Sequence, residues 1–357
     1  MTARGIESDL NNLMATTLQD VAKLAGVSVG TVSQALNHNP KVAAETRSRV
    51  LDAAKTLGYV FKERTSFFPR PANSVSVIGV LSKHDVGDST LVNPFYSHIL
   101  AGIEDECRKR GMSLMFATVY VDDQNRPVEW PPMINNHLVN GLILVGTLIE
   151  KSAVFIQRHI DIPVVLIDGY APSLFIDSVV TDNLQGAHLA MNHLIELGHQ
   201  KIGLLGWHPN SPQSIMERYQ GYVEIMQARG LDSKSYIEES FLSTPVGCSA
   251  AIALLKRHPD ITALFACNDE TAIGAMDGLK QMGLKVPDDI SIVGFDNVRL
   301  TEDITPPLTT IHVHKNWLGI VGARLLLERA EFPEKPRSTT SIATQLVIRK
   351  TTAPPRN

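Results

Sequence analysis

Apolar residues near the start of this 357-residue chain recur with helical spacing. Leu18, Val21, Ala22 and Ala25 stand at positions i, i+3, i+4 and i+7, which places them on one face of a short helix. The same spacing predicts two further helices, with inward-facing residues Val32, Ala35 and Leu36 in the second and Val50, Leu51, Ala54 and Leu57 in the third. Three such helices can close one small core.

Polar residues and a glycine mark the ends of these helices. Thr17 followed by Asp20 is a start signal of the capping-box type. Gly26 can adopt the left-handed conformation that ends a helix, and Ser28 can then cap the next helix. Two short helices joined in this way are typical of a DNA-binding helix-turn-helix, but periodicity alone fits an ordinary helical hairpin equally well.

From Val75 onward the pattern changes to short apolar runs that alternate with amphipathic segments. Apolar runs without alternation indicate strands that are buried on both faces, and helical segments between them indicate a parallel α/β sheet. The runs are 77–81, 113–117, 142–145 and 164–167, followed by a second series at 201–205, 263–266 and 291–295. The restart after residue 200 predicts two similar lobes.

Charge is distributed unevenly along the chain, although the net charge is only −4. Residues 1–70 carry nine Lys and Arg against six Asp and Glu, a balance of +3, so the remaining residues carry −7. A basic end is the end that would meet phosphate, and its candidate phosphate neutralisers are Arg47, Arg49, Lys55, Lys62 and Arg64. An excess of three positive charges also fits an ordinary solvated surface.

The three cysteines lie far apart and show no metal-ligand spacing, which argues against disulfides and zinc. No apolar run approaches the roughly 20 residues of a membrane span, and residues 1–15 lack an apolar signal core. We therefore expect a cytoplasmic protein without a membrane partner.

Segment 17–37, TLQDVAKLAGVSVGTVSQALN, and the residues up to Tyr59 resemble the headpiece of the lac-repressor family. Residues 75–350 resemble the periplasmic-sugar-binding type of core found in that family, on the motifs NPFY at 93–96, VTDN at 180–183, HLIELGH at 193–199 and PPLTTI at 306–311. The resemblance covers nearly the whole chain. It implies an α/β fold: a small all-α helix-turn-helix headpiece and a two-lobed core of doubly wound parallel sheets.

The resemblance divides the chain into a headpiece at 16–61, a linker at 62–74 and an effector-binding and dimerisation core at 75–350. We expect the N-terminal lobe to span about 75–179 and 306–335. The C-terminal lobe should then span about 180–305 and 336–350.

The headpiece resemblance implies DNA-binding roles for Thr17, Ser28, Val29, Gly30, Thr31, Ser33, Gln34, Asn37 and Tyr59. Val29 and Gly30 stand where the family usually has larger polar residues. Gln34 replaces a common Arg or His, and its amide suits an adenine edge where Arg would favour guanine. Thr31, Ser33, Asn37 and Tyr59 are better assigned to phosphate contacts, which position the helix without specifying bases.

The linker departs from the family pattern, because the usual hinge-helix sequence is replaced by KERTSFFPRP at 62–71. In the family that helix wedges a leucine into the minor groove and kinks the operator. We hypothesise that Phe67 or Phe68 supplies the wedge. The alternative is a proline-stiffened tether whose aromatic rings pack on the core.

In the core, polar residues follow strand-like runs and should face a cleft at the carboxyl ends of the strands. Arg218 matches the family's ligand-clamping arginine, and its planar donors suit vicinal hydroxyls or a carboxylate. The candidate effector-binding residues are Phe95, Tyr96, Asp168, Trp207, Arg218, Asn268 and Asp296, with Phe175 as a further aromatic ring that could stack on a sugar. For Asp269, ligand contact and capping of the following helix are equally plausible.

The residues that hydrolytic, nucleotide-binding or metal-binding sites require are missing or stand in the wrong context. Residues 26–30 match a hydrolase nucleophile elbow literally, but that motif needs a preceding strand and this one follows a helix. The chain shows neither a dinucleotide-binding glycine motif nor a P-loop, and its histidine pairs lack partners at ligand spacing. We expect no catalytic residues, no metal and no cofactor.

The sequence thus predicts a homodimeric repressor that binds a pseudo-palindromic operator in double-stranded DNA and is controlled by a small effector, most simply a sugar or sugar derivative. A regulator that responds to a nucleoside or purine stays open. So does a sugar receptor or sugar-processing protein with a vestigial headpiece. The pattern does not decide whether the effector induces or co-represses.

Overall fold

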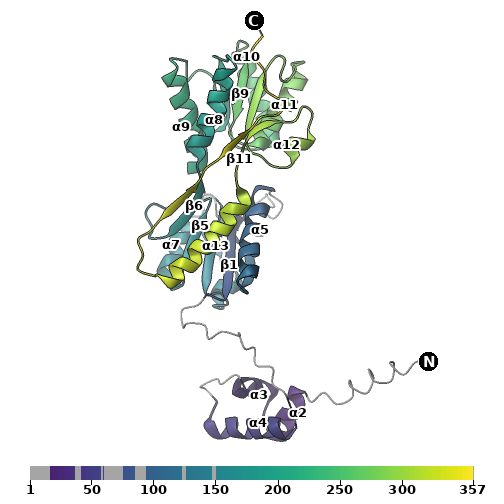
Figure 1. The fold of residues 1–357 in the computed structure, drawn as a ribbon, viewed down its shortest axis with the longest axis vertical. Helices are drawn as coiled ribbons and strands as arrows, with labels where there is room; N and C mark the ends of the chain where they lie inside the picture. Colours follow the sequence, from purple (N-terminus) through teal and green to yellow (C-terminus); the bar gives the residue numbers. More distant parts are fainter. Residues whose placement is uncertain are drawn as a thin grey trace, which may run out of the picture. The chain divides into compact units, whose positions relative to one another are not determined.

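The computed structural model describes residues 17–36, 42–57, 59, 75–84, 94–122, 126–146 and 150–356. These residues belong to two compact units, one before and one after residue 72 (Figure 1). The linker with Phe67 and Phe68, and also Asn37, Gly58, Lys62 and Arg64, lie outside the described residues.

The first unit contains three helices, α2 (Leu18–Ala25), α3 (Val29–Leu36) and α4 (Ala44–Thr56). The predicted capping signals are confirmed: Asp20 and Thr17 form a reciprocal capping box, and Gly26 ends α2 with φ of 65°. The Ser28 hydroxyl accepts the backbone N–H of Thr31 at 3.1 Å and so caps α3. Local sequence therefore determines the turn between α2 and α3.

The inward faces of these helices meet in one apolar core. Its buried members are Val21, Ala22, Ala25, Val32, Ala35, Leu36, Val42, Val50, Ala53 and Ala54. Leu51, predicted to face inward, is 43% exposed, so that prediction is wrong. It neighbours Val50 on α4, and the two α-helices that pack on α4 cover only the narrower stripe of Val50, Ala53 and Ala54.

The second unit contains two mainly parallel sheets, which confirms the predicted two-lobed α/β class. The first sheet has the strand order β12-β6-β5-β4-β1-β2-β3. Its strands are β1 (Val77–His84), β2 (Ser113–Val121), β3 (Pro127–Glu129), β4 (Gly141–Val145), β5 (Val164–Ile167), β6 (Asp177–Thr181) and β12 (Thr339–Ile342).

Helices cover both faces of this sheet, as unalternated apolar strands require. Alternate residues of β4 separate the two faces: Ile143 and Val145 join the core shared with α5 and α13, while Leu142 and Leu144 join the core of α6 and α7. The helices are α5 (Pro94–Lys109), α6 (Pro132–Asn135), α7 (Glu150–His159) and α13 (Lys315–Glu331).

The second sheet has the order β13-β11-β10-β9-β7-β8, with β7 (Ile202–Trp207), β8 (Ile237–Glu239), β9 (Ala263–Ala266), β10 (Ser291–Asp296), β11 (Thr309–His312) and β13 (Gln345–Val347). It packs with α8 (Asn183–Glu196), α9 (Gln213–Ala228), α10 (Thr244–Arg257) and α11 (Asp269–Gln281). The short helix α12 (Leu300–Asp303) follows β10.

Strand pairing corrects the expected lobe limits. Residues 309–312 were expected in the N-terminal lobe, but β11 pairs in parallel with β10 of the second sheet. Residues 339–342 were expected in the C-terminal lobe, but β12 pairs with β6 of the first sheet. The chain therefore passes between the lobes after β6, after β11 and after β12, and these three crossings form the hinge (Figure 1).

Candidate functional site

The exposed face of α3 carries the residues that the sequence assigns to DNA reading. Val29 is 42% exposed, and Gly30 and Gln34 are also exposed. A Cβ built on Gly30 would meet only the Ser28 hydroxyl, at 3.7 Å, so this part of the helix surface is flat and open. An exposed short helix that begins with small residues can approach the floor of a DNA major groove closely.

Other predicted DNA-binding residues have structural roles in the headpiece. Thr17 and Ser28 are caps, and the Thr31 and Ser28 hydroxyls lie 2.9 Å apart. Tyr59 packs partly buried against the headpiece core. Their contacts with DNA phosphates stay predictions.

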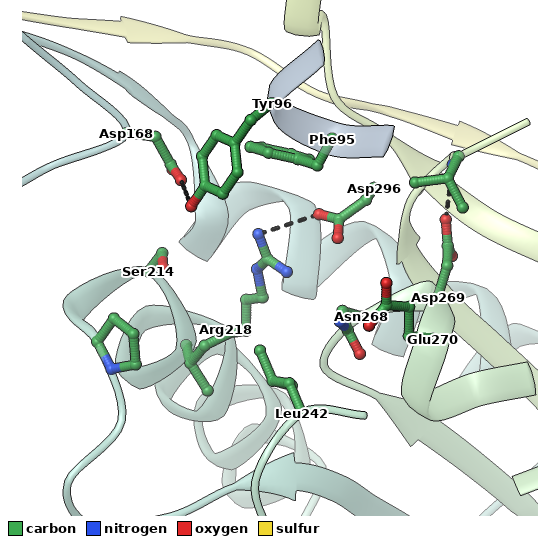
Figure 2. A pocket seen from close by; sticks show the side chains of 13 residues that line it. Phe95, Tyr96, Asp168, Ser214, Arg218, Leu242, Asn268, Asp269, Glu270 and Asp296 are labelled. Carbon is green, nitrogen blue, oxygen red and sulfur yellow. Dashed lines mark hydrogen bonds and ion pairs between the residues drawn. The ribbon is translucent and has the colours of Figure 1, made fainter. Parts of the chain in front are cut away.

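A cavity of about 120 Å³ lies between the two lobes of the second unit. Phe95 and Tyr96 at the start of α5 and Asp168 after β5 line it from the first lobe, and Arg218, Asn268 and Asp296 line it from the second (Figure 2). Asp168, Asn268 and Asp296 follow or end β5, β9 and β10, which is the position predicted for them. At roughly 10–15 Å³ for each water-sized group, the cavity suits a small polar molecule rather than an extended chain of sugars.

Arg218 is the central cation of this cleft. Its side chain is 5% exposed and lies 3.3 Å from Asp296 Oδ1. The guanidinium donates to Asn183 Oδ1 at 3.0 Å and to the Cys267 carbonyl at 2.5 Å, and it stacks on the Phe295 ring at 3.7 Å. These contacts hold the planar group in one orientation, which a directional clamp requires.

Asp296 Oδ1 is buried and has no well-directed hydrogen bond from any described residue, although Arg218 lies near it. A buried carboxylate oxygen held only by this longer ion pair can accept a further, better-directed donor. A hydroxyl or amino group of a ligand in the cleft would supply that donor. Asp296 is therefore the strongest candidate for direct effector contact.

Two of the cleft aspartates also have unusual backbone conformations. Asp168 has φ of 57° and Asp296 has φ of 109°, a region that residues with a Cβ rarely adopt. Each such residue costs on the order of 1–3 kcal/mol and persists where the surrounding structure enforces it, commonly at functional sites. The strain is consistent with selection of these two positions for binding rather than for stability.

Burial dominates the electrostatics of the cleft. It raises the pKa of Asp168 to about 7, although Arg218 and a hydrogen bond from the Tyr96 hydroxyl at 3.2 Å act in the opposite direction. Burial also raises the pKa of Asp296, again against Arg218. The charge of Asp168 therefore changes near neutral pH.

We predict that Asp168→Asn becomes more stable relative to the wild type as the pH rises. Because folding raises the pKa of Asp168, ionisation above the ordinary carboxyl range favours the unfolded chain. The relative gain between pH 6 and pH 8 should be on the order of 1–2 kcal/mol in the free energy of unfolding, measured by urea denaturation at several pH values. The Asn side chain can still accept the hydrogen bond from the Tyr96 hydroxyl. The control is Asp277→Asn on the exposed side of α11. A constant difference across this pH range would contradict the prediction.

Asp269 lines the cavity but has a structural role. Its two oxygens accept from the Val298 N–H at 2.9 Å and the Thr310 hydroxyl at 2.5 Å. These bonds tie Asp269 to Val298, two residues after Asp296, and to Thr310 of β11. Asn268, not Asp269, caps α11 by accepting the Thr271 N–H at 2.9 Å, so Asn268 combines capping with its place in the cavity wall.

Two predicted aromatic residues do not line the cavity. Trp207 stacks on Tyr219 of α9 at 4.1 Å and donates from Nε1 to Met216 Sδ at 3.3 Å. Phe175 is 61% exposed and lies beside Arg329. In both cases packing against a neighbouring element, which spacing along the chain does not reveal, decides where the ring lies.

Sequence reasoning missed several lining residues, among them Ser214, Leu242 and Glu270. Ser214 lies one helical turn before Arg218 on α9, so helical periodicity would have found it. Leu242 follows β8, whose residues Ile237–Glu239 are too polar and too few to be recognised as a strand.

Among the ranges that the structure describes, no three His, Cys, Asp or Glu side chains are placed to hold a metal ion. Nor is any helix in those ranges long and apolar enough to cross a membrane.

An exposed helix-turn-helix on the same chain as a two-lobed ligand cleft defines a class, the ligand-responsive DNA-binding regulators. Family models agree: residues 17–61 match bacterial regulatory proteins of the lacI family, and residues 191–352 match a periplasmic binding protein-like domain. A PurR transcriptional repressor from Mannheimia succiniciproducens is 33% identical over 345 residues, which cover 94% of this chain and 98% of that protein. The chain belongs to the lacI family of bacterial regulatory proteins.

Solved structures show the same relationship. A LacI family regulator from Enterococcus faecium with bound ribose matches at 30% identity and a TM-score of 0.67, over 79% of this chain and all of that one. The lac repressor dimer bound to operator and the anti-inducer ONPF matches at 27% identity and a TM-score of 0.69, over 95% of this chain and 99% of that one. The predicted family is therefore confirmed.

Proposed function

We propose that this protein is a homodimeric transcriptional repressor. Its binding to a pseudo-palindromic operator is controlled by a small effector in the cleft around Arg218 and Asp296. The observation that carries the proposal is one chain with both an open α3 face and a polar cavity lined from two hinged lobes. An effector that binds one lobe arrangement better than another shifts the balance between DNA-binding and free forms. In this proposal the core binds its ligand without transforming it.

We propose a monosaccharide or sugar derivative as the effector. Its hydroxyl groups would meet the carboxylates of Asp168 and Asp296 and the donors of Arg218, and the Phe95 ring would offer an apolar face. Bound ribose in the Enterococcus faecium regulator supports this class. The PurR relatives and the Phe95 ring favour a second candidate, a purine or nucleoside, which has fewer hydroxyl groups and a flat face.

The experiment that tests DNA binding selects an operator from random duplexes with the full chain and then measures affinity against salt. If several phosphates are neutralised, affinity should fall on the order of 10³-fold or more between 50 and 200 mM salt. A flat response would favour a receptor with a vestigial headpiece.

Gln34→Ala should relax base preference at one step of each half-site, by about 1–3 kcal/mol of discrimination. Gln34 is exposed, so the headpiece should keep its fold. Asp52→Asn, an exposed change on α4 rather than α3, should leave the selected sequence unchanged. An unchanged preference in Gln34→Ala would remove this residue from base reading.

A further inference from the structure

A second cavity, of about 420 Å³, lies at the hinge between the lobes and is distinct from the effector cleft. His98 of α5 lines it from the first lobe, and Arg299, just before α12, lines it from the second. The crossing from β11 to α13 completes it with His312, His314 and Lys315. Residues on both lobes therefore face one cavity.

Cationic and imidazole side chains dominate this second cavity. Its one described carboxylate is that of Glu302, which is 62% exposed and pairs with Arg349 at 2.9 Å. The pKa of His312 is lowered by burial and then by the positive charge of Lys315, by His314 and by Arg349. The surroundings of His312 thus disfavour added positive charge, and an anion would relieve this repulsion.

Lys315 is held against the cavity wall. Its side chain is buried, and its ammonium donates to the carbonyls of Asp296, Asn297 and Val313. All three acceptors are neutral, so the ammonium charge is not cancelled by a carboxylate in direct contact. Burial lowers the pKa of Lys315, while the nearby carboxylates of Asp296 and Asp269 favour its charged form, so the cavity wall carries a partly compensated ammonium.

The cavity also contains the N-terminus of α13, a helix of 17 residues that begins at Lys315. This helix has no side-chain cap and no acidic residue in its first turn, so nothing there offsets the positive end of its dipole. Trp317 is 45% exposed on the same wall and offers a flat apolar face. A phosphate group near the helix end and an organic group against Trp317 would match this lining.

We propose that the hinge cavity binds a small phosphate-bearing molecule at a site separate from the effector cleft. The two cavities share short stretches of chain: Asp296 of the cleft precedes Asn297 of the hinge cavity, and Tyr96 of the cleft is two residues from His98. A ligand that contacts both lobes at the hinge changes the relative stability of their arrangements and hence effector affinity. Anion binding itself does not depend on the proposed DNA or effector functions.

The test titrates the full chain with inorganic phosphate and separately with phenyl phosphate, at ionic strength held constant with chloride. Binding is followed by calorimetry and by tryptophan fluorescence, with Trp317→Phe identifying the signal from the cavity. We expect saturable binding that is at least tenfold weaker in the double variant His98→Gln, His314→Gln. Tighter binding of phenyl phosphate would identify an organic phosphate as the ligand class, and equal binding would identify the phosphate ion.

Two controls keep the test specific. Lys256→Gln removes an exposed cation on α10 that lines neither cavity and should bind phosphate like the wild type. Arg218→Lys, which alters the effector cleft, should also keep phosphate binding. The proposal fails if the wild type shows no saturable binding, if the double variant, with an unchanged circular dichroism spectrum, binds like the wild type, or if only Arg218→Lys loses binding.

Discussion

Arg218→Lys is expected to weaken effector binding at least 100-fold while the core stays folded. Lys retains the charge beside Asp296, but it cannot reproduce the planar donors that bond Asn183 and Cys267 while facing the cavity. A ligand at 100 times its dissociation constant should stabilise the wild type by about 2.7 kcal/mol. A 100-fold loss of affinity would leave only about 0.4 kcal/mol at the same concentration.

The measurement is a thermal-shift screen of wild type and variant against sugars, sugar phosphates, nucleosides and purines. Arg257→Lys is the matched control, because Arg257 is half exposed and bonds Glu238 and the Ile237 carbonyl outside the cleft. A compound that stabilises the wild type and Arg257→Lys but not Arg218→Lys would place the effector in this cleft and name its class. Equal stabilisation of all three would remove Arg218 from effector binding.

Gly319→Ala is expected to destabilise the core by about 3 kcal/mol or more. The helices α5 and α13 touch backbone to backbone: a Cβ on Gly319 would lie 2.1 Å from the Ile99 carbonyl oxygen, and one on Gly102 would lie 2.0 Å from that of Asn316. No rotamer change relieves a clash with backbone, so the helices must separate, and the lost packing outweighs the roughly 1 kcal/mol by which Ala favours a helix.

Urea denaturation of the core transition measures this effect. Gly30→Ala is the control, because a Cβ there makes only an ordinary contact with the Ser28 hydroxyl at 3.7 Å. This change should leave the core unchanged and stabilise the headpiece by up to about 1 kcal/mol. A core as stable in Gly319→Ala as in the wild type would show that α5 and α13 can separate at little cost. In that case the packing of these helices would not be what positions Phe95, Tyr96 and His98.

The family and its two-lobed class were predictable because their signals are local. Thr17, Asp20, Gly26 and Ser28 act through hydrogen bonds and dihedral angles within a few residues, so the sequence is enough to predict the turn between α2 and α3. Strand ends were predictable in the same way, and because parallel strands end at one edge of a sheet, Asp168, Asn268 and Asp296 were expected to converge.

The sequence by itself determined the headpiece turn, the parallel strands and the polar residues at the strand ends, since each depends on neighbours along the chain. Only the tertiary structure decided that residues 309–312 belong to the second lobe and residues 339–342 to the first, because strand pairing joins segments far apart in sequence. It also decided that Trp207 packs on Tyr219, and it brought His98 and Arg299 to one cavity. Such contacts depend on how helices and sheets pack in three dimensions, which the hydrophobic pattern of one segment does not contain.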